Sequence, residues 1–215
     1  MNGLLIAATK FEIEPCFKAL KGNDDWQVVI TGIGSVATAY AILKAIEKYK
    51  PDFMLQAGIA GSFDQQIQLG DVVIAASDLF GDLGVIENKK RKTIFDLNLE
   101  SAGKSPFKNG RLLNHNKKLV KISGRPVVHA VSVNEITTAK ADISYYKKEL
   151  EVAIESMEGA AFHYTALKEK IPFLQMRSIS NYVGVRDKKK WNIQPAITNL
   201  NNEVLKLIHK ITNEA

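Results

Sequence analysis

The stretch VAIESMEGAAFHYTALKEKIPFLQMRSISN, residues 152–181, has the pattern of a strand, a helix and a second strand. Residues 152–156 and 173–179 are short and mostly apolar, and the segment 158–170 between them predicts a helix. Strands that alternate with helices favour an α/β layer fold. Ligands of such folds gather at the carboxyl ends of the strands, where this stretch carries Glu158 and Asn181.

The same alternation continues through most of the chain. Further strands are predicted at 4–8, 26–31, 53–56, 72–76 and 126–133, and further helices at 11–20, 36–49, 139–150 and 191–211. Glycine turns are expected after two of these strands, at 32–34 and 58–61. Residues 81–125 predict loops with one helix near Asn116. We therefore expect residues 1–215 to form a single domain with an α/β fold, in which a mixed central β-sheet is flanked by helices in three layers.

The composition and the N-terminus favour a cytoplasmic protein. Of the 215 residues, 46% are hydrophobic and 24% are charged, which is an ordinary globular balance. The apolar run at 3–8 is too short for a secretory signal, and no run approaches the roughly 18 to 20 residues of a membrane span. The single cysteine, Cys16, cannot form an intrachain disulfide and is expected to pack in the core. We expect no membrane partner.

The net charge of +6 is concentrated in one segment. Between Glu87 and Arg125 there are eleven Lys or Arg against three Asp or Glu, which gives this segment +8 and leaves −2 for the rest. Aromatic side chains that could stack on bases do not interleave with the basic run at 89–92. The segment is therefore interpreted as a solvated surface, and no nucleic-acid partner is expected.

The motifs for cofactors and metals are incomplete. Gly32, Gly34 and Ala37 match the dinucleotide-binding fingerprint in form, but Gln56 and Ala57 stand where an acidic residue would hold the cofactor ribose. The histidines are scattered and there is no cysteine pair, so the sequence has no metal-ligand spacing. It also has no P-loop and no G-x-S-x-G elbow. We expect no cofactor and no metal.

Two glutamates and one arginine near strand ends are candidates for chemistry. Glu12 could deprotonate a water molecule, or it could be an ordinary carboxylate at a helix N-terminus. Glu158 could accept hydrogen bonds from both ribose hydroxyls with Met157 against the sugar, or it could be a first-turn carboxylate beside a core methionine. Arg177 belongs to a strand expected to be buried, and a buried guanidinium needs partners such as Glu12 or Glu158.

Asn181 is the candidate for recognising a base. Its side-chain amide has an acceptor and two donors, so it can face the N7–H and the O6 of a departing 6-oxopurine together. Adenine has a 6-amino group instead, which is served better by an acceptor or a protonated carboxyl. The alternative is that Ser180 and Asn181 are only the polar turn that ends a strand.

The ordered motifs resemble those of the nucleoside phosphorylase and hydrolase superfamily, in particular its 5'-methylthioadenosine/S-adenosylhomocysteine nucleosidases. The matching segments are AATKFEIE (7–14), TGIGSVATA (31–39), QAGIAGSF (56–63), LGDVVIA (69–75), ESMEGAAF (155–162) and MRSISNYVG (176–184). The resemblance implies a mixed sheet flanked by helices, usually in a homodimer or larger homo-oligomer. It also implies a small nucleoside as the binding partner.

The same resemblance assigns roles to individual residues. Glu12 would be the acid/base that activates water, and Met157 and Glu158 would hold the ribose. Arg177 and Ser180 would support the site. Further substrate-binding candidates by this resemblance are Ile59, Ala60, Gly61 and Ile136.

The chain departs from the nucleosidase pattern at Asn181, where an aspartate normally meets the adenine N7. The segment SNYVGVRDKKKW (180–191) is similar to that of the futalosine hydrolases of the alternative menaquinone pathway, whose substrate carries hypoxanthine. That substrate is anionic, so the resemblance predicts a basic pocket, with Arg186 or a cation of 87–125 as the candidate.

The nucleophile is expected to be water rather than phosphate. A phosphate needs a cluster of cationic or amide donors. Phosphorylases of the superfamily typically carry arginines in two loops that read TKFE (9–12) and QAGIAGSF (56–63) here. We therefore expect a hydrolase that cleaves futalosine into hypoxanthine and dehypoxanthine futalosine. The alternatives are a 5'-methylthioadenosine/S-adenosylhomocysteine nucleosidase, a purine nucleoside phosphorylase, and a nucleoside-binding module without turnover.

Overall fold

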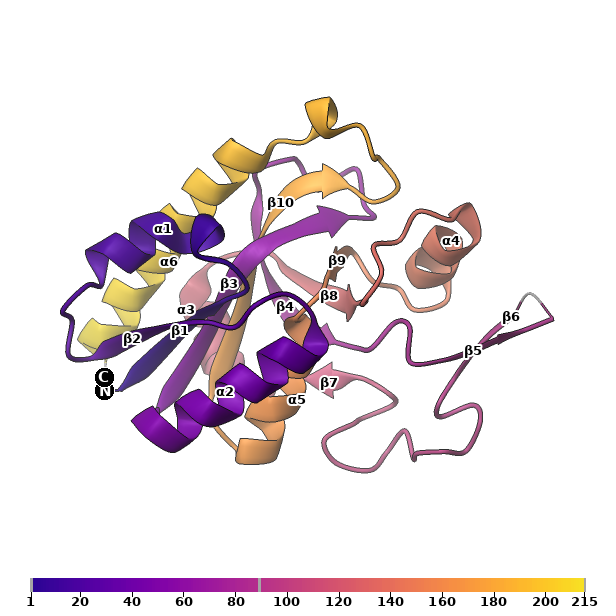
Figure 1. The fold of residues 1–215 in the computed structure, drawn as a ribbon, viewed down its shortest axis with the longest axis horizontal. Coiled ribbons are helices and arrows are strands. Elements are labelled where there is room, and N and C mark those ends of the chain that lie inside the picture. Colours follow the sequence, from indigo (N-terminus) through magenta and orange to yellow (C-terminus); the bar gives the residue numbers. More distant parts are fainter. Residues whose placement is uncertain (1, 89, 215) are drawn as a thin grey trace.

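The computed structural model describes residues 2–88 and 90–214, and its helices and strands alternate along the chain as predicted (Figure 1). The strands are β1 (Gly3–Ala7), β2 (Trp26–Ile30), β3 (Phe53–Ser62), β4 (Val72–Asp78), β5 (Gly84–Glu87), β6 (Lys90–Thr93), β7 (Leu112–Leu113), β8 (Val127–Ser132), β9 (Ile154–Ser156) and β10 (Phe173–Tyr182). The helices are α1 (Lys10–Ala19), α2 (Ser35–Tyr49), α3 (Lys117–Ser123), α4 (Lys140–Lys148), α5 (Gly159–Glu169) and α6 (Ile193–Glu214), with a 3-10 turn at Lys188–Lys190.

The main sheet is mixed and closes partly on itself. Its path runs β10-β4-β8-β9-β3-β1-β2, and β7 pairs with β4. Strands β2, β1, β3 and β10 are parallel neighbours, whereas β4 is antiparallel to β10. Strands β8 and β9 continue in parallel from β4, and β9 returns to pair antiparallel with the end of β3. The predicted mixed sheet is confirmed, and its closure through β3, β10, β4, β8 and β9 is a feature that the sequence pattern did not predict.

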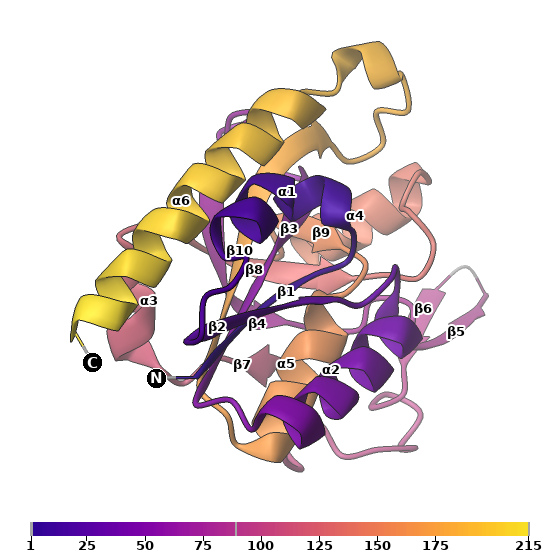
Figure 2. The same ribbon diagram turned by 60° about the vertical axis from the view of Figure 1, so that its left-hand side comes forward.

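Helices cover both faces of this sheet and complete the three predicted layers. Along β1, Leu5 and Ala7 pack with side chains of α1 and α6, while Leu4 and Ile6 pack with side chains of α2 and α5. This alternation is that of a strand buried on both faces. In Figures 1 and 2, α1 lies along α6 on one side of the sheet and α2 lies beside α5 on the other.

The last helix buries the face that its periodicity predicted. Leu200, Val204 and Leu207 of α6 are buried in one cluster with Cys16 of α1. Burial of each such side chain stabilises the fold by about 1.5–3 kcal/mol. The packing role expected for Cys16 is confirmed, and its burial raises the pKa of the thiol to about 12, which keeps the sulfur protonated at neutral pH.

Two strands are longer than the sequence predicted. The turn predicted at 58–61 is wrong, because β3 continues to Ser62 and pairs with β10 along this stretch. Strand β10 likewise runs through Ser180 and Asn181 to Tyr182 instead of ending at 179. A continuous strand between two partners satisfies its backbone hydrogen bonds, so its glycines serve close approach rather than a turn.

The segment 81–125 contains more regular structure than predicted. The hairpin of β5 and β6 forms a separate two-stranded sheet, and β7 adds to the main sheet. The helix expected near Asn116 is confirmed as α3, and the Asn116 side chain caps it by accepting a hydrogen bond from Leu119 N at 3.1 Å. Among the helices in residues 2–88 and 90–214, none is long and apolar enough to cross a membrane.

Candidate active site

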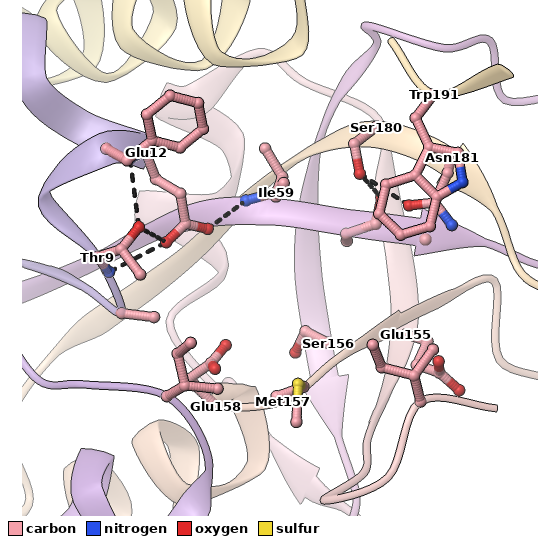
Figure 3. A pocket seen from close by; sticks show the side chains of 16 residues that line it. Thr9, Glu12, Ile59, Glu155, Ser156, Met157, Glu158, Ser180, Asn181 and Trp191 are labelled. Carbon is pink, nitrogen blue, oxygen red and sulfur yellow. Dashed lines mark hydrogen bonds between the residues drawn. The ribbon is translucent and has the colours of Figure 1, made fainter. Parts of the chain in front are cut away.

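The carboxyl ends of β1, β3, β9 and β10 meet at one pocket of about 290 Å³ (Figure 3). Its lining consists of Ala8, Thr9, Phe11, Glu12, Ile33, Ile59, Ala60, Gly61, Ile136, Glu155, Ser156, Met157, Glu158, Ser180, Asn181 and Trp191. Nine of the residues proposed from the sequence are therefore brought together here, namely Glu12, Ile59, Ala60, Gly61, Ile136, Met157, Glu158, Ser180 and Asn181. They come from segments that are far apart in the sequence, because parallel strands end at the same edge of a sheet.

Glu12 is held in place at one end of the pocket. Its Oε2 accepts hydrogen bonds from Thr9 N at 3.1 Å and Thr9 Oγ1 at 2.8 Å, and its Oε1 accepts one from Ile59 N at 3.0 Å. Thr9 and Glu12 form the capping box that begins α1, so the start of the helix also orients the carboxylate. Glu12 is only 8% exposed. A carboxylate fixed in this way can accept a proton from a bound water without first reorganising.

Glu158 lies at the same end of the pocket, and both of its carboxylate oxygens contact nitrogen atoms of the protein. Its Oε1 accepts a hydrogen bond from Gly34 N at 3.2 Å, and its Oε2 lies 3.6 Å from Nη1 of Arg177. Arg177 is almost fully buried and also donates from Nη2 to Gln56 Oε1 at 3.0 Å. Both terminal nitrogens of the guanidinium therefore face an acceptor, whereas its buried Nε has no hydrogen-bond partner among the residues that the structure describes.

Gly58 leaves the space that these charged groups occupy. A Cβ added at Gly58 would collide with Nη1 of Arg177 and lie 3.0 Å from Oε1 of Glu12. The missing side chain is therefore what allows a guanidinium and a carboxylate to approach the same stretch of β3.

Asn181 and Ser180 form the opposite end of the pocket. Ile179 pairs with Ala60 and Asn181 pairs with Gly61, so Ser180 is an extra residue in β10, a β-bulge. Ser180 Oγ donates to Asn181 Oδ1 at 2.9 Å, and Asn181 Nδ2 donates to Tyr182 O at 3.2 Å. These bonds fix the amide and leave one N–H and one lone pair of Oδ1 for a ligand.

Two predicted residues do not line the pocket. Arg177 stands behind the wall, as described above, and Arg186 packs its guanidinium over the ring of Trp191 with 5.5 Å to the centroid. Trp191 itself lines the pocket, so Arg186 contacts a lining residue but does not line the pocket.

The prediction of a basic pocket for an anionic substrate is wrong for the residues that line this pocket. Within residues 2–88 and 90–214, the lining carries the three carboxyls of Glu12, Glu155 and Glu158 and no lysine or arginine. The cationic segment 87–125 contributes no lining residue in the described part of the chain. Its charges lie on other surfaces, including ion pairs such as Arg91 Nη2 with Asp142 Oδ1 at 2.9 Å.

Sequence reasoning missed Glu155. Its Oε1 accepts a hydrogen bond from Thr137 N at 3.1 Å, whereas its Oε2 is buried and has no hydrogen-bond partner within the described ranges. Burial raises the pKa of the Glu155 carboxyl above its ordinary value, and hydrogen bonding by Thr137 opposes this effect. The signal was an acidic residue inside a short apolar strand, which is unusual for a buried position.

The buried carboxyl group of Asp78 stabilises the backbone at the start of α5. Asp78 Oδ1 accepts hydrogen bonds from Leu79 N at 2.8 Å and Ser132 Oγ at 3.0 Å, and burial raises the pKa of Asp78 to about 6. Ser132 Oγ in turn accepts from Ala160 N at 2.8 Å, in the first turn of α5. Because Glu158 directly precedes α5, this network fixes the backbone that carries Glu158.

No group of His, Cys, Asp or Glu suited to a metal ion occurs among the residues that the structure describes.

The chain matches the model of one protein family over most of its length. That model is described as the phosphorylase superfamily, and it matches residues 9–212. The 5'-methylthioadenosine/S-adenosylhomocysteine nucleosidase of Maridesulfovibrio salexigens is 28% identical over 163 residues, which cover 72% of this chain and 67% of that protein. The futalosine hydrolase of Thermus thermophilus is 26% identical over 216 residues, which cover 95% of this chain and 94% of that protein.

The fold is also that of solved structures. The 5'-methylthioadenosine/S-adenosylhomocysteine nucleosidase of Colwellia psychrerythraea, solved in complex with adenine, superposes with a TM-score of 0.81 at 21% identity. The superposition covers 98% of this chain and 95% of that one. The arrangement of the sheet and helices is therefore shared with this enzyme.

Proposed function

This chain belongs to the phosphorylase superfamily, and from that premise we propose that it is a futalosine hydrolase, which cleaves the N-glycosidic bond of futalosine and releases hypoxanthine. The coarser statement, an enzyme that hydrolyses nucleosides, agrees with both kinds of relatives, the nucleosidases and the futalosine hydrolases. The choice of futalosine rests on Asn181, at the end of the pocket opposite Glu12, which is proposed to hold the base. It rests also on the similarity of segment 180–191 to that of the futalosine hydrolases.

The single observation that carries hydrolysis is the lining around Glu12. A phosphate nucleophile carries negative charge and is bound by cationic or clustered amide donors. In residues 2–88 and 90–214 the lining offers three carboxyls and no lysine or arginine. Two of these carboxyls, Glu12 and Glu158, stand at the end where a nucleophile would attack the sugar (Figure 3). The pocket therefore favours neutral water over phosphate.

The geometry gives each group at this end a step in the reaction. Glu12, fixed by Thr9 and Ile59, would take a proton from water as the water attacks the anomeric carbon. Glu158 would accept hydrogen bonds from the ribose hydroxyls while Met157 packs against the sugar. The nearby carboxylates also favour the positive charge of an oxocarbenium-like transition state.

The other end of the pocket would hold the departing base. The free N–H of Asn181 can donate to O6 of hypoxanthine, and the free lone pair of Oδ1 can accept from N7–H. Arg177 touches neither sugar nor base in this scheme, so we treat it as a positioning residue for Glu158. The absence of a lining cation means that the 5' carboxylate of futalosine would have to extend beyond the described pocket.

Cleavage of 5'-methylthioadenosine or S-adenosylhomocysteine is the second candidate. It is favoured by the 28% identity to a nucleosidase and by the apolar lining residues Phe11 and Ile33, which would suit a methylthio group better than a carboxylate.

A homo-oligomer remains part of the proposal. Val36 is 83% exposed and Tyr40 is 67% exposed on one side of α2, and the pocket-lining residues Ile33 and Phe11 are exposed as well. An exposed apolar group of this kind suits contact with a second copy of the chain. Analytical ultracentrifugation of the purified protein measures this directly, and a monomer at micromolar concentration would contradict it. A cytoplasmic location and a single-domain organisation stay predictions.

Product analysis tests the function. The purified protein is incubated with futalosine, inosine and 5'-methylthioadenosine, each with and without phosphate, and the free base and the sugar product are measured. Phosphate-independent release of hypoxanthine from futalosine is expected. Ribose 1-phosphate formed only with phosphate would identify a phosphorylase, and adenine release from 5'-methylthioadenosine alone would identify the nucleosidase.

A further inference from the structure

Glu155 and Asn181 stand on either side of one glycine in the sheet. Gly61 of β3 pairs with Asn181 of β10 and also with Glu155 of β9. Residues in register on neighbouring strands present their side chains on the same face. With strands about 4.8 Å apart, the backbones of Asn181 and Glu155 are on the order of 10 Å from each other, across a position that has no side chain.

This row lies at the end of the pocket away from the proposed water site. Figure 3 shows Glu12 and Glu158 at one end of the pocket and Asn181 and Glu155 at the other. A Cβ at Gly61 would lie 3.0 Å from Cγ2 of Val183 and 3.3 Å from Nδ2 of Asn181, so the missing side chain lets both side chains lie close to β3. Gly61, Asn181 and Glu155 all line the pocket, so a flat purine ring can lie there with polar groups at its edges.

Glu155 has an unused acceptor. The residue is 7% exposed, its Oε1 is occupied by Thr137 N, and its Oε2 has no partner among the residues that the structure describes. A buried polar atom without a partner is costly, and in a residue that lines a pocket a ligand can supply the missing partner. Glu158, the other carboxyl of this segment, differs in that both of its oxygens already face donors.

We infer that Glu155 is a specificity-determining residue, and that its free Oε2 accepts a hydrogen bond from N1–H of a 6-oxopurine while Asn181 contacts the O6 and N7 edge. A 6-oxopurine carries a hydrogen on N1, whereas adenine has a lone pair there, so a carboxylate accepts from the former and repels the latter. This inference rests on the proposed function, because it assigns the base that the same pocket holds.

The surroundings of Glu155 agree with a role that is completed by a ligand. Burial raises its pKa, and the nearby Asp82 acts in the same direction. A ligand N–H at Oε2 would supply the hydrogen bond that a buried carboxylate needs and so favour its charged form.

Binding of free bases tests the inference separately from turnover. Affinities for hypoxanthine and adenine are measured by calorimetry on the wild type, on Glu155→Gln and on Glu135→Gln as a matched control. Glutamine preserves the acceptor for Thr137 N but can place an amide N–H where Oε2 was. Glu155→Gln is expected to bind hypoxanthine about ten- to a hundredfold more weakly and to bind adenine at least as well as the wild type. Glu135 is exposed, so Glu135→Gln is expected to bind like the wild type.

The wild type provides an independent measurement if the variant does not fold, as judged by thermal unfolding. Hypoxanthine is compared with 1-methylhypoxanthine, which lacks the N1 hydrogen, and at least tenfold weaker binding of the methylated base is expected. Unchanged base preference in a folded Glu155→Gln, or equal binding of the two bases by the wild type, would overturn the inference. The result is distinguishable from failure of the proposed function alone. In that case the wild type would bind hypoxanthine with this preference but would release none from futalosine.

Discussion

The two ends of the pocket contain carboxyl groups that are equally buried but differently satisfied. Glu12 is 8% exposed and Glu155 is 7% exposed. Glu12 accepts three hydrogen bonds on its two oxygens, whereas Glu155 accepts one from Thr137 N and keeps Oε2 unpartnered in the described part of the chain. Burial alone therefore does not decide what a carboxyl group can do. The donors around it decide whether it is fixed in advance or left open for a ligand.

Replacement of Glu12 is expected to have the largest effect, because it removes the proposed proton acceptor at the end of the pocket proposed to hold the sugar. Glu12→Gln should lower kcat by about 10²- to 10⁴-fold, the usual contribution of positioned proton transfer. KM should change little, since Glu12 is not proposed to hold the substrate. The measurement is steady-state hydrolysis of futalosine.

The matched control for this experiment is Glu14→Gln. Glu14 lies on the same helix, but its exposed carboxylate pairs with Lys18 at 3.0 Å outside the pocket. It should retain full activity. Near-normal turnover in Glu12→Gln would remove Glu12 from the mechanism, and the contrast between the two ends of the pocket would lose its functional meaning.

Replacement of Arg177 tests how much the sugar end depends on its buried cation. Arg177→Met leaves Glu158 without its charged partner and should reduce the free energy of unfolding by about 3–5 kcal/mol. KM for the nucleoside should rise as well, because Glu158 loses a contact that holds it. Chemical denaturation and steady-state kinetics measure the two effects.

An exposed ion pair supplies the comparison. Arg125 Nη2 lies 2.7 Å from Glu203 Oε2, which is closer than the 3.6 Å between Arg177 and Glu158, but Arg125 is far more exposed. Arg125→Met should therefore cost less than about 1 kcal/mol despite the shorter distance. An equal loss of stability in both variants would show that burial does not set the strength of the Arg177 contact.

Replacement of Asn181 should change the base end without stopping the reaction. In Asn181→Asp, the carboxyl can accept from the 6-amino group of adenine and, when protonated, can donate to N7. We expect the ratio of kcat/KM for adenine over hypoxanthine nucleosides to rise by about tenfold, the value of one hydrogen bond. Asn202→Asp, on the exposed side of α6, is the control. An unchanged ratio would show that Asn181 does not set the preference between the two bases.

Much of the fold could be predicted from local patterns. The order of strand, helix and strand in residues 152–181, the bounds of α5 and the long apolar face of α6 were predicted closely, because period and composition report directly on burial. The end of β3 was predicted wrongly, because glycine is typical both of turns and of strands that a neighbour approaches closely. At Gly58 that neighbour is the guanidinium of Arg177, more than a hundred residues away in the sequence.

The sequence by itself determined the alternation of elements, the superfamily resemblance and most of the side chains that line the pocket, because those depend on residue types in order along the chain. Only the tertiary structure decided that Arg177 stands behind the wall and that Arg186 packs on Trp191. It also decided that Glu155 joins the lining opposite Asn181. The reason is physical: the β-bulge at Ser180 and the return of β9 to β3 set which side chains share a face, and both arise from pairing between distant strands.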